Sequence, residues 1–112
     1  MKRPQLNRKL VLEQPEQIAD GAGGFITVWQ SLGMLWADFE ARTGRETNVV
    51  GGSVARTNYR VTIRAAPDGA PSRPVAKQRF VEGARVFQID AVTESKFGSA
   101  FLTCFVTEEL AQ

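Results

Sequence analysis

The residue types that carry most enzyme chemistry are scarce in this sequence. Histidine is absent, and Cys104 is the only cysteine among the 112 residues. The chain therefore cannot build a Cys/His zinc site, a Ser-His-Asp triad, a Cys-His pair or an internal disulfide. Because no histidine activates the thiol, we interpret Cys104 as a small buried apolar residue.

Carboxylates and one tyrosine are the acid–base groups that remain. The sequence has twelve Asp and Glu residues and a single tyrosine, Tyr59. We interpret the adjacent pair Glu108 and Glu109 as a solvated chain end and not as a site. The composition predicts a protein that is not an enzyme and that needs no metal and no cofactor.

Arginine dominates the cations. Ten of the fourteen Lys and Arg residues are Arg, yet the net charge is only +2. So small a charge argues against strong binding to nucleic acid. Arg makes forked contacts with carboxylates and phosphates and is enriched at protein interfaces, so the bias indicates a contact-making surface. GC-rich codons explain it as well.

Length and hydropathy bound the elements that could position these groups. A chain of this size forms one domain, here residues 1–112. It has no apolar run long enough to span a membrane and no signal peptide behind its basic N-terminus. We expect a soluble protein, made in a cytoplasm, with no membrane partner.

Residues 25–46, FITVWQSLGMLWADFEARTGRE, fit two structures. The large apolar residues are spaced by four and three, as in an amphipathic helix. The β-branched start and Gly33 disfavour a helix and favour two strands that are separated by a bulge or bend at Gly33.

Most of the remaining sequence alternates as strands do. We expect a strand around Leu10 that Pro15 ends, a hairpin connection at ADGAGG, and a turn at APDGAPSRP that does not pack. The inward residues of the later strands would be Tyr59, Val61, Ile63, Phe87, Ile89, Ala91, Ala100, Leu102, Cys104 and Val106. About six to seven short strands predict an all-β fold, a small antiparallel barrel or sandwich.

One long loop interrupts the strands. Residues 45–57, RETNVVGGSVART, exceed the length of most hairpin connections, and Gly51 with Gly52 gives the loop a flexible middle. Long ordered loops in small domains tend to be functional. A short helix or loop packed on the barrel is the other interpretation.

The order of these motifs resembles the phage head-tail joining proteins, also called head-completion or stopper proteins. The resemblance covers nearly the whole chain, through DGAGGF, Trp29, LWADFEARTGRE, YRVTIR, KQRFVEGARVFQIDAV and LTCFV. The composition is also similar to copies carried by gene transfer agents. Ala65–Ala66, where the family often has an aromatic residue, and the proline-rich PDGAPSRP loop depart from the pattern.

The resemblance implies a β-barrel subunit without enzymatic activity that assembles with itself into a ring of six or twelve copies. The ring would lie below the portal or adaptor ring, hold the packaged double-stranded DNA, and dock the tail terminator or tail tube at the head-tail junction. The channel-gating loop would comprise Arg45, Glu46, Asn48, Val49, Val50, Gly51, Gly52, Ser53, Val54 and Arg56. Its two basic ends, Arg45 and Arg56, would make any nonspecific contact with DNA.

Charged residues on the strands would orient neighbouring subunits. The expected interface residues are the cations Arg60, Arg64, Arg79 and Arg85, facing carboxylates such as Asp38, Glu40, Glu82 and Asp90 of the same or the adjoining subunit. A basic N-terminal arm that docks on a neighbouring ring would comprise Lys2, Arg3, Arg8 and Lys9; a frayed terminus is the other interpretation. Apart from the resemblance, a small OB-like barrel that binds single-stranded nucleic acid remains the competing function.

Overall fold

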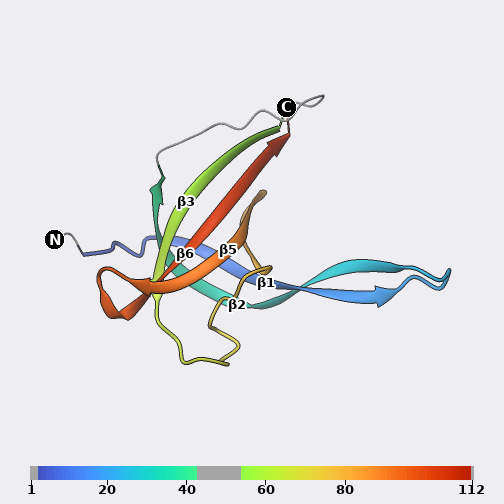
Figure 1. The fold of residues 1–112 in the computed structure, drawn as a ribbon, viewed down its shortest axis with the longest axis horizontal. Helices are drawn as coiled ribbons and strands as arrows, with labels where there is room; N and C mark the ends of the chain where they lie inside the picture. The colour runs from blue at the N-terminus through green and yellow to red at the C-terminus, as the bar shows by residue number, and fades with distance from the viewer. Residues whose placement is uncertain (1–2, 43–53, 112) are drawn as a thin grey trace.

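The chain folds as a closed β-barrel (Figure 1). The computed structural model describes residues 3–42 and 54–111. Its strands are β1 (Arg8–Ala19), β2 (Phe25–Ala41), β3 (Val54–Arg64), β4 (Arg79–Glu82), β5 (Arg85–Ser95) and β6 (Gly98–Ala111). They pair antiparallel in the order β1-β2-β3-β6-β5-β4, and β4 returns to pair with β1. The predicted all-β barrel is confirmed; the described residues form no helix, and so none long enough to cross a membrane.

The core lies inside the barrel and follows the period-two alternation of the strands. Three aromatic rings, Phe39, Tyr59 and Phe87, meet edge to face with centroids 4.9 to 5.8 Å apart. The fully packed aliphatic side chains around them include Leu10, Leu12, Val61, Ile63, Ile89, Leu102 and Val106. Cys104 is also fully buried, which raises the pKa of its thiol to about 12, so it is the apolar residue that the sequence predicted.

Within the segment that fitted either a helix or two strands, residues 25–41 form one continuous strand, β2, of 17 residues, and residues 43–46 lie outside the described residues. The helix is therefore excluded. Leu12 of β1 pairs with Gly33 and the next residue, Glu13, pairs with Ser31, so Leu32 is the extra residue of a β-bulge. Gly33 has φ +125°, which a residue with a Cβ rarely adopts. The predicted irregularity at Gly33 exists, but it bends the strand without ending it.

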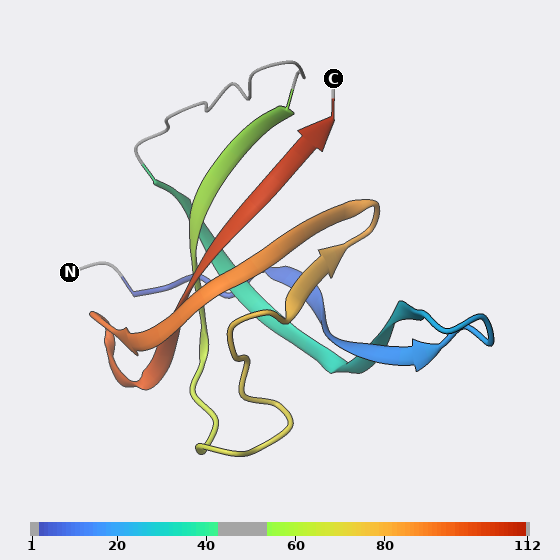
Figure 2. The same ribbon diagram turned by 45° about the vertical axis from the view of Figure 1, so that its right-hand side comes forward.

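The outer parts of β1 and β2 form a two-stranded ribbon, residues 14–30, which we call the arm (Figures 1 and 2). β4 pairs with β1 only from Val11 to Glu13, so the arm leaves the barrel beyond that point. Pro15 lies inside the arm opposite Trp29, and the prediction that it ends the strand is wrong. Proline is tolerated because a strand with one neighbour leaves alternate amides without a sheet partner.

The tip of the arm is the hairpin connection that ADGAGG predicted. The carboxylate of Asp20 accepts hydrogen bonds from the backbone N–H groups of Ala22 and Gly24, at 2.7 and 3.0 Å. The N–H of Asp20 also donates to the carbonyl oxygen of Gly24 at 3.0 Å. These bonds fix the turn and so fix the register of the arm.

The expected extent of the long loop, the expected lack of packing in the turn after β3 and two expected inward positions are wrong. Residues 54–57, assigned to the long loop, belong to β3 and pair with residues 108–111 of β6. The turn after β3 does pack, because Pro74 is fully buried and Arg73 donates to the carbonyl oxygen of Ala66 at 2.9 Å. A bulge at Asp90 flips the phase of β5, so Ala91 is exposed instead of buried. Ala100, also expected to lie inward, is exposed near the start of β6.

Candidate functional site

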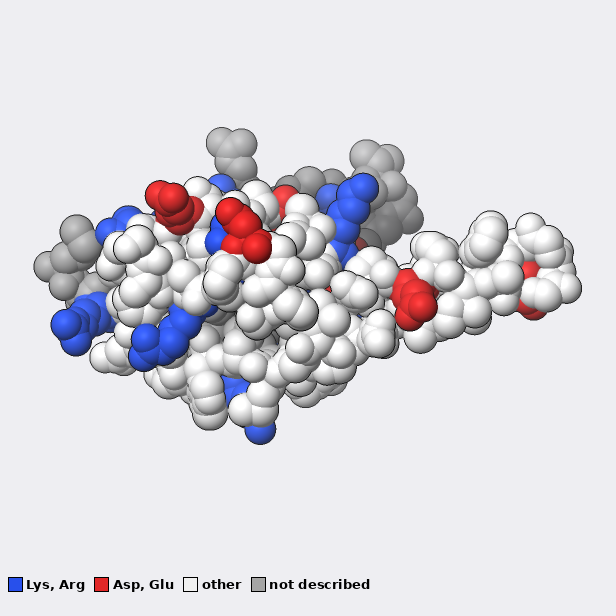
Figure 3. All heavy atoms as spheres, turned by 90° about the horizontal axis from the view of Figure 1, so that it is seen from below, with Lys and Arg blue, Asp and Glu red and all other residues white. Residues whose placement is uncertain are grey.

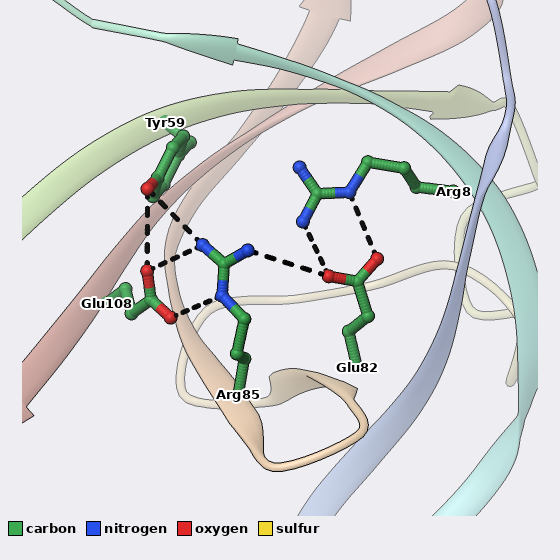
Figure 4. Close-up of polar contacts among 5 residues, drawn as sticks. All are labelled: Arg8, Tyr59, Glu82, Arg85 and Glu108. Atoms are coloured by element: carbon green, nitrogen blue, oxygen red, sulfur yellow. Dashed lines mark hydrogen bonds and ion pairs between the residues drawn. The ribbon is translucent and has the colours of Figure 1, made fainter.

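A cluster of alternating cations and carboxylates closes the barrel mouth beside the β4–β5 turn (Figure 4). This mouth cluster consists of Arg8 of β1, Tyr59 of β3, Glu82 of β4, Arg85 of β5 and Glu108 of β6. The remaining strand, β2, joins through Phe39, whose ring lies 3.8 Å below the guanidinium of Arg8. Each of the six strands therefore contributes one side chain to this group of contacts.

The contacts within the mouth cluster run in series. Arg85 forks onto Glu108, with Nε 2.8 Å from Oε2 and Nη2 2.9 Å from Oε1. The hydroxyl of Tyr59 donates to Oε1 of Glu108 at 3.4 Å. Nη1 of Arg85 lies 3.8 Å from Oε1 of Glu82, and Nε of Arg8 donates to Oε2 of Glu82 at 3.0 Å.

Each carboxylate of the mouth cluster is held in its ionised form. The forked hydrogen bonds from Arg85 lower the pKa of Glu108, and the bonds from Arg8 lower the pKa of Glu82, although burial opposes both shifts. The same contacts raise the pKa of Arg85 above its ordinary value. Because these groups stay charged and bond to one another, the arrangement ties strands together and presents no poised acid or base.

Glu108 corrects the interpretation of the C-terminal carboxylates. Glu108 is only 2% exposed and lies on the inward face of β6 with Cys104 and Val106. Glu109, on the other face, is exposed and pairs with Arg56 at 2.8 Å. The solvated chain end is therefore right for Glu109 and wrong for Glu108, because period two places alternate residues on opposite faces.

The expected interface charges mostly have partners within the chain. Arg60 pairs with Glu40 at 3.3 Å, and Arg79 pairs with Glu13 at 2.7 Å while its guanidinium lies 3.9 Å from the ring of Trp29. Arg85 lies on the same face of β5 as buried Phe87 and not on the polar face, although its side chain at the barrel mouth is 43% exposed. The other expected partners are also placed: Arg64 lies over Phe101, Asp38 accepts a bond from the backbone of Gln5, and Asp90 accepts one from Thr107.

The structure describes only part of the expected gate and of the expected basic N-terminal segment. Residues 45–53 of the gate and Lys2 lie outside the described residues. Val54 and Arg56 belong to β3. Arg3 and Lys9 are exposed. Arg8, in contrast, is an inward residue of β1 bonded to Glu82, so it does not belong to a free N-terminal segment.

The arm is the surface that the sequence analysis missed. It exposes Phe25 (70%), Ile26 (53%), Ile18 (42%) and Val28 (39%). No Lys or Arg occurs between Leu10 and Ala41, and Figure 3 shows the arm with acidic and no basic side chains. The sequence did contain a signal for this surface: a long stretch without Lys or Arg, in which apolar residues occupy both the odd and the even positions and so both faces of the strands.

The described residues thus form a small closed barrel with an ionic cluster at its mouth and an exposed apolar arm. Within residues 3–42 and 54–111, no three metal-ligating side chains come together. The chain belongs to the phage head completion protein family, whose model matches residues 1–109.

A solved structure carries the same fold. A chain from the "virion of native gene transfer agent (GTA) particle" is 44% identical, with a TM-score of 0.86, and the match covers 98% of this chain and 100% of that one. Among curated proteins, no sequence matches this chain significantly. The suspected family is therefore confirmed.

Proposed function

We propose that this protein is a structural head-tail connector subunit of a tailed phage or phage-like particle. The observation that supports this most strongly is family membership over residues 1–109, together with the full-length likeness to a chain of a gene transfer agent particle. The protein would act at the head-tail junction, after assembly in the bacterial cytoplasm. It would catalyse no reaction.

In this proposal the subunit forms a ring below the portal or adaptor ring and presents a docking surface to the tail terminator or tail tube. Two features support a role in assembly. The charges of the mouth cluster pair within the chain and need no partner subunit. The arm, in contrast, exposes apolar side chains on both faces, and such surfaces mark protein contacts.

The connection between β2 and β3 is proposed as the channel gate. It joins Ala41 to Val54, and it begins where the N–H of Arg42 bonds to the carbonyl oxygen of Asn58. Several copies meeting on the ring axis would close the channel, and Gly51 with Gly52 would let each loop swing aside. Contact with the DNA end would be nonspecific.

A loop substitution tests the gate. We expect Gly51→Pro combined with Gly52→Pro to leave the barrel folded and to give particles that leak DNA or fail to eject it. Gly51→Ala combined with Gly52→Ala is the matched control, since alanine keeps the backbone N–H and does not fix φ as proline does. Normal DNA retention and delivery by the gate variant would remove the gating role.

Deletion of the gene tests the connector role itself. Electron micrographs should then show DNA-filled or leaking heads separated from finished tails, with joining restored by the wild-type gene. Intact joined particles without this protein would rule out the proposed function. The competing hypothesis, an OB-like binder of single-stranded nucleic acid, is not favoured by the family found here.

A further inference from the structure

We propose that the arm of each copy docks in an apolar groove on the next copy of this chain, and that this contact builds the ring of the proposed connector. The groove, which we call the docking groove, has a volume of about 280 Å³. It is lined by Leu6 before β1, Leu35 and Trp36 of β2, and Arg64, Ala65 and Ala66 at the end of β3, with Ser72 at its rim. The inference rests on the connector function proposed above.

The arm cannot cover its own apolar surface. In the register of the hairpin, Ile18 pairs with Ile26 and Glu16 with Val28, so these side chains share one face of the ribbon. Phe25 and Ala19 form the next pair, on the opposite face. A two-stranded ribbon with apolar residues on both faces is marginal in water unless something packs against it.

The lining of the docking groove is mostly apolar. Arg64 is the one charged residue among the described residues that line it. A larger groove, of about 570 Å³, is lined by charges of both signs, including Arg56, Asp90 and Glu109. Of the two, only the docking groove suits an apolar tip such as Phe25 with Ile26.

Charge selects the same pairing. The exposed charges of the arm are the carboxylates of Glu16 and Asp20, since no cation occurs between Leu10 and Ala41. The docking groove carries exposed Arg64, and exposed Lys9 lies opposite Trp36 in the β1–β2 register. A second copy of this chain therefore offers both the apolar surface and the opposite charge that the arm lacks.

The contact must be made between copies. The arm continues β1 and β2 straight out of the barrel, so its tip lies far from the rest of its own chain (Figures 1 and 2). Tip and groove are different surfaces, so the contact is heterologous and repeats from copy to copy until it closes by rotation. A ring is the closed form of such a contact.

Cysteine trapping tests this contact in assembled particles. The native thiol of Cys104 is fully buried, so only engineered cysteines should form disulfides between chains. A chain carrying both Ala22→Cys at the tip and Ser72→Cys at the groove rim should give, after mild oxidation, a ladder of covalent multimers on non-reducing gels. The matched control, Ala22→Cys with Thr93→Cys on another exposed face of the barrel, should stay monomeric.

Mixing separates contact between copies from closure within one chain. Particles built from one chain with only Ala22→Cys and another with only Ser72→Cys should give covalent dimers and nothing larger, because each cross-link needs one tip and one groove. Cross-linking of Ala22→Cys to a different virion protein, or an absent ladder in particles whose junction contains this chain, would overturn the docking proposal and leave the connector function standing. Absence of the chain from the junction in electron micrographs would instead overturn the connector function.

Discussion

The mouth cluster and the arm differ in which side chains they bury and which they expose. In the mouth cluster, charged groups from separate strands lie inward and pair with one another, and Glu108 is only 2% exposed. In the arm, apolar groups lie outward, and Phe25 is 70% exposed although it is bonded into a regular strand. The buried carboxylate of Glu108 and the exposed ring of Phe25 both depart from the usual distribution of polar and apolar side chains.

The difference teaches which part of the molecule is self-sufficient. Every charge of the mouth cluster finds its partner within the chain, so that region needs nothing from a neighbour to be stable. The apolar side chains of the arm lie far from the core and gain little from folding alone. Stability should therefore depend on the mouth cluster, and assembly should depend on the arm.

The largest effect is expected from breaking the mouth cluster. Glu108→Gln removes the buried carboxylate and leaves the guanidinium of Arg85 without its main partner, which should lower the free energy of unfolding by about 2 to 4 kcal/mol. Urea denaturation followed by tryptophan fluorescence measures the change. The control is Glu109→Gln, because Glu109 pairs with Arg56 in solvent and its loss should cost less than about 1 kcal/mol. Equal midpoints for the two variants would contradict a structural role for the cluster.

The arm should show the opposite pattern, with assembly lost and stability kept. We expect Phe25→Ser with Ile26→Ser to change the free energy of unfolding by less than about 0.5 kcal/mol, since both residues are exposed. Joined particles should fall by about tenfold or more, counted in electron micrographs, because the apolar contact is lost. Val86→Ser, which changes an exposed apolar residue on the barrel, should leave joining unchanged. Normal joining by the arm variant would show that the arm is not an assembly surface.

Acid should weaken the barrel through the mouth cluster. The pKa values of Glu82 and Glu108 lie below the ordinary value of 4.5 in the folded protein. Their contribution to stability is therefore fully present above about pH 4.5 and is lost as the pH falls through the lower folded values. The unfolding free energy of the wild type should fall more steeply below that pH than that of Glu108→Gln. Parallel curves would exclude the ionised Glu108 as the source.

The smallest effect is expected from the exposed pair of Arg60 and Glu40. Their side chains are 44% and 54% exposed, and the N–O distance is 3.3 Å. A double-mutant cycle with Arg60→Gln and Glu40→Gln should give a coupling energy below about 1 kcal/mol in urea denaturation of the dissociated protein. A coupling above about 2 kcal/mol would show that the pair resembles the mouth cluster and not an ordinary surface pair.

The sequence predicted features that depend on near neighbours. Alternation placed Tyr59, Val61 and Ile63 on the inward face, and the glycine-rich run marked the tip of the arm correctly. Such features follow from the period of a strand and from the backbone freedom of glycine. Both can be read from a few consecutive residues.

The features that failed depend on residues far apart in the chain. Arg8 meets Glu82 across 74 positions, and Arg85 meets Glu108 across 23, so no local pattern reveals either pair. The bulge at Asp90 changed the phase of β5 because its partner strand, β6, has no matching extra residue. The length of β2 was underestimated because Gly33 was taken as a possible break, whereas pairing with β1 on both sides of the bulge holds the strand together.

Cryo-electron microscopy of the head-tail junction tests the central claim most directly. We predict a closed ring of this chain between head and tail, with each barrel separate and each arm lying on the next copy beside Trp36 and Arg64. A junction whose density holds no copy of this barrel would contradict the account.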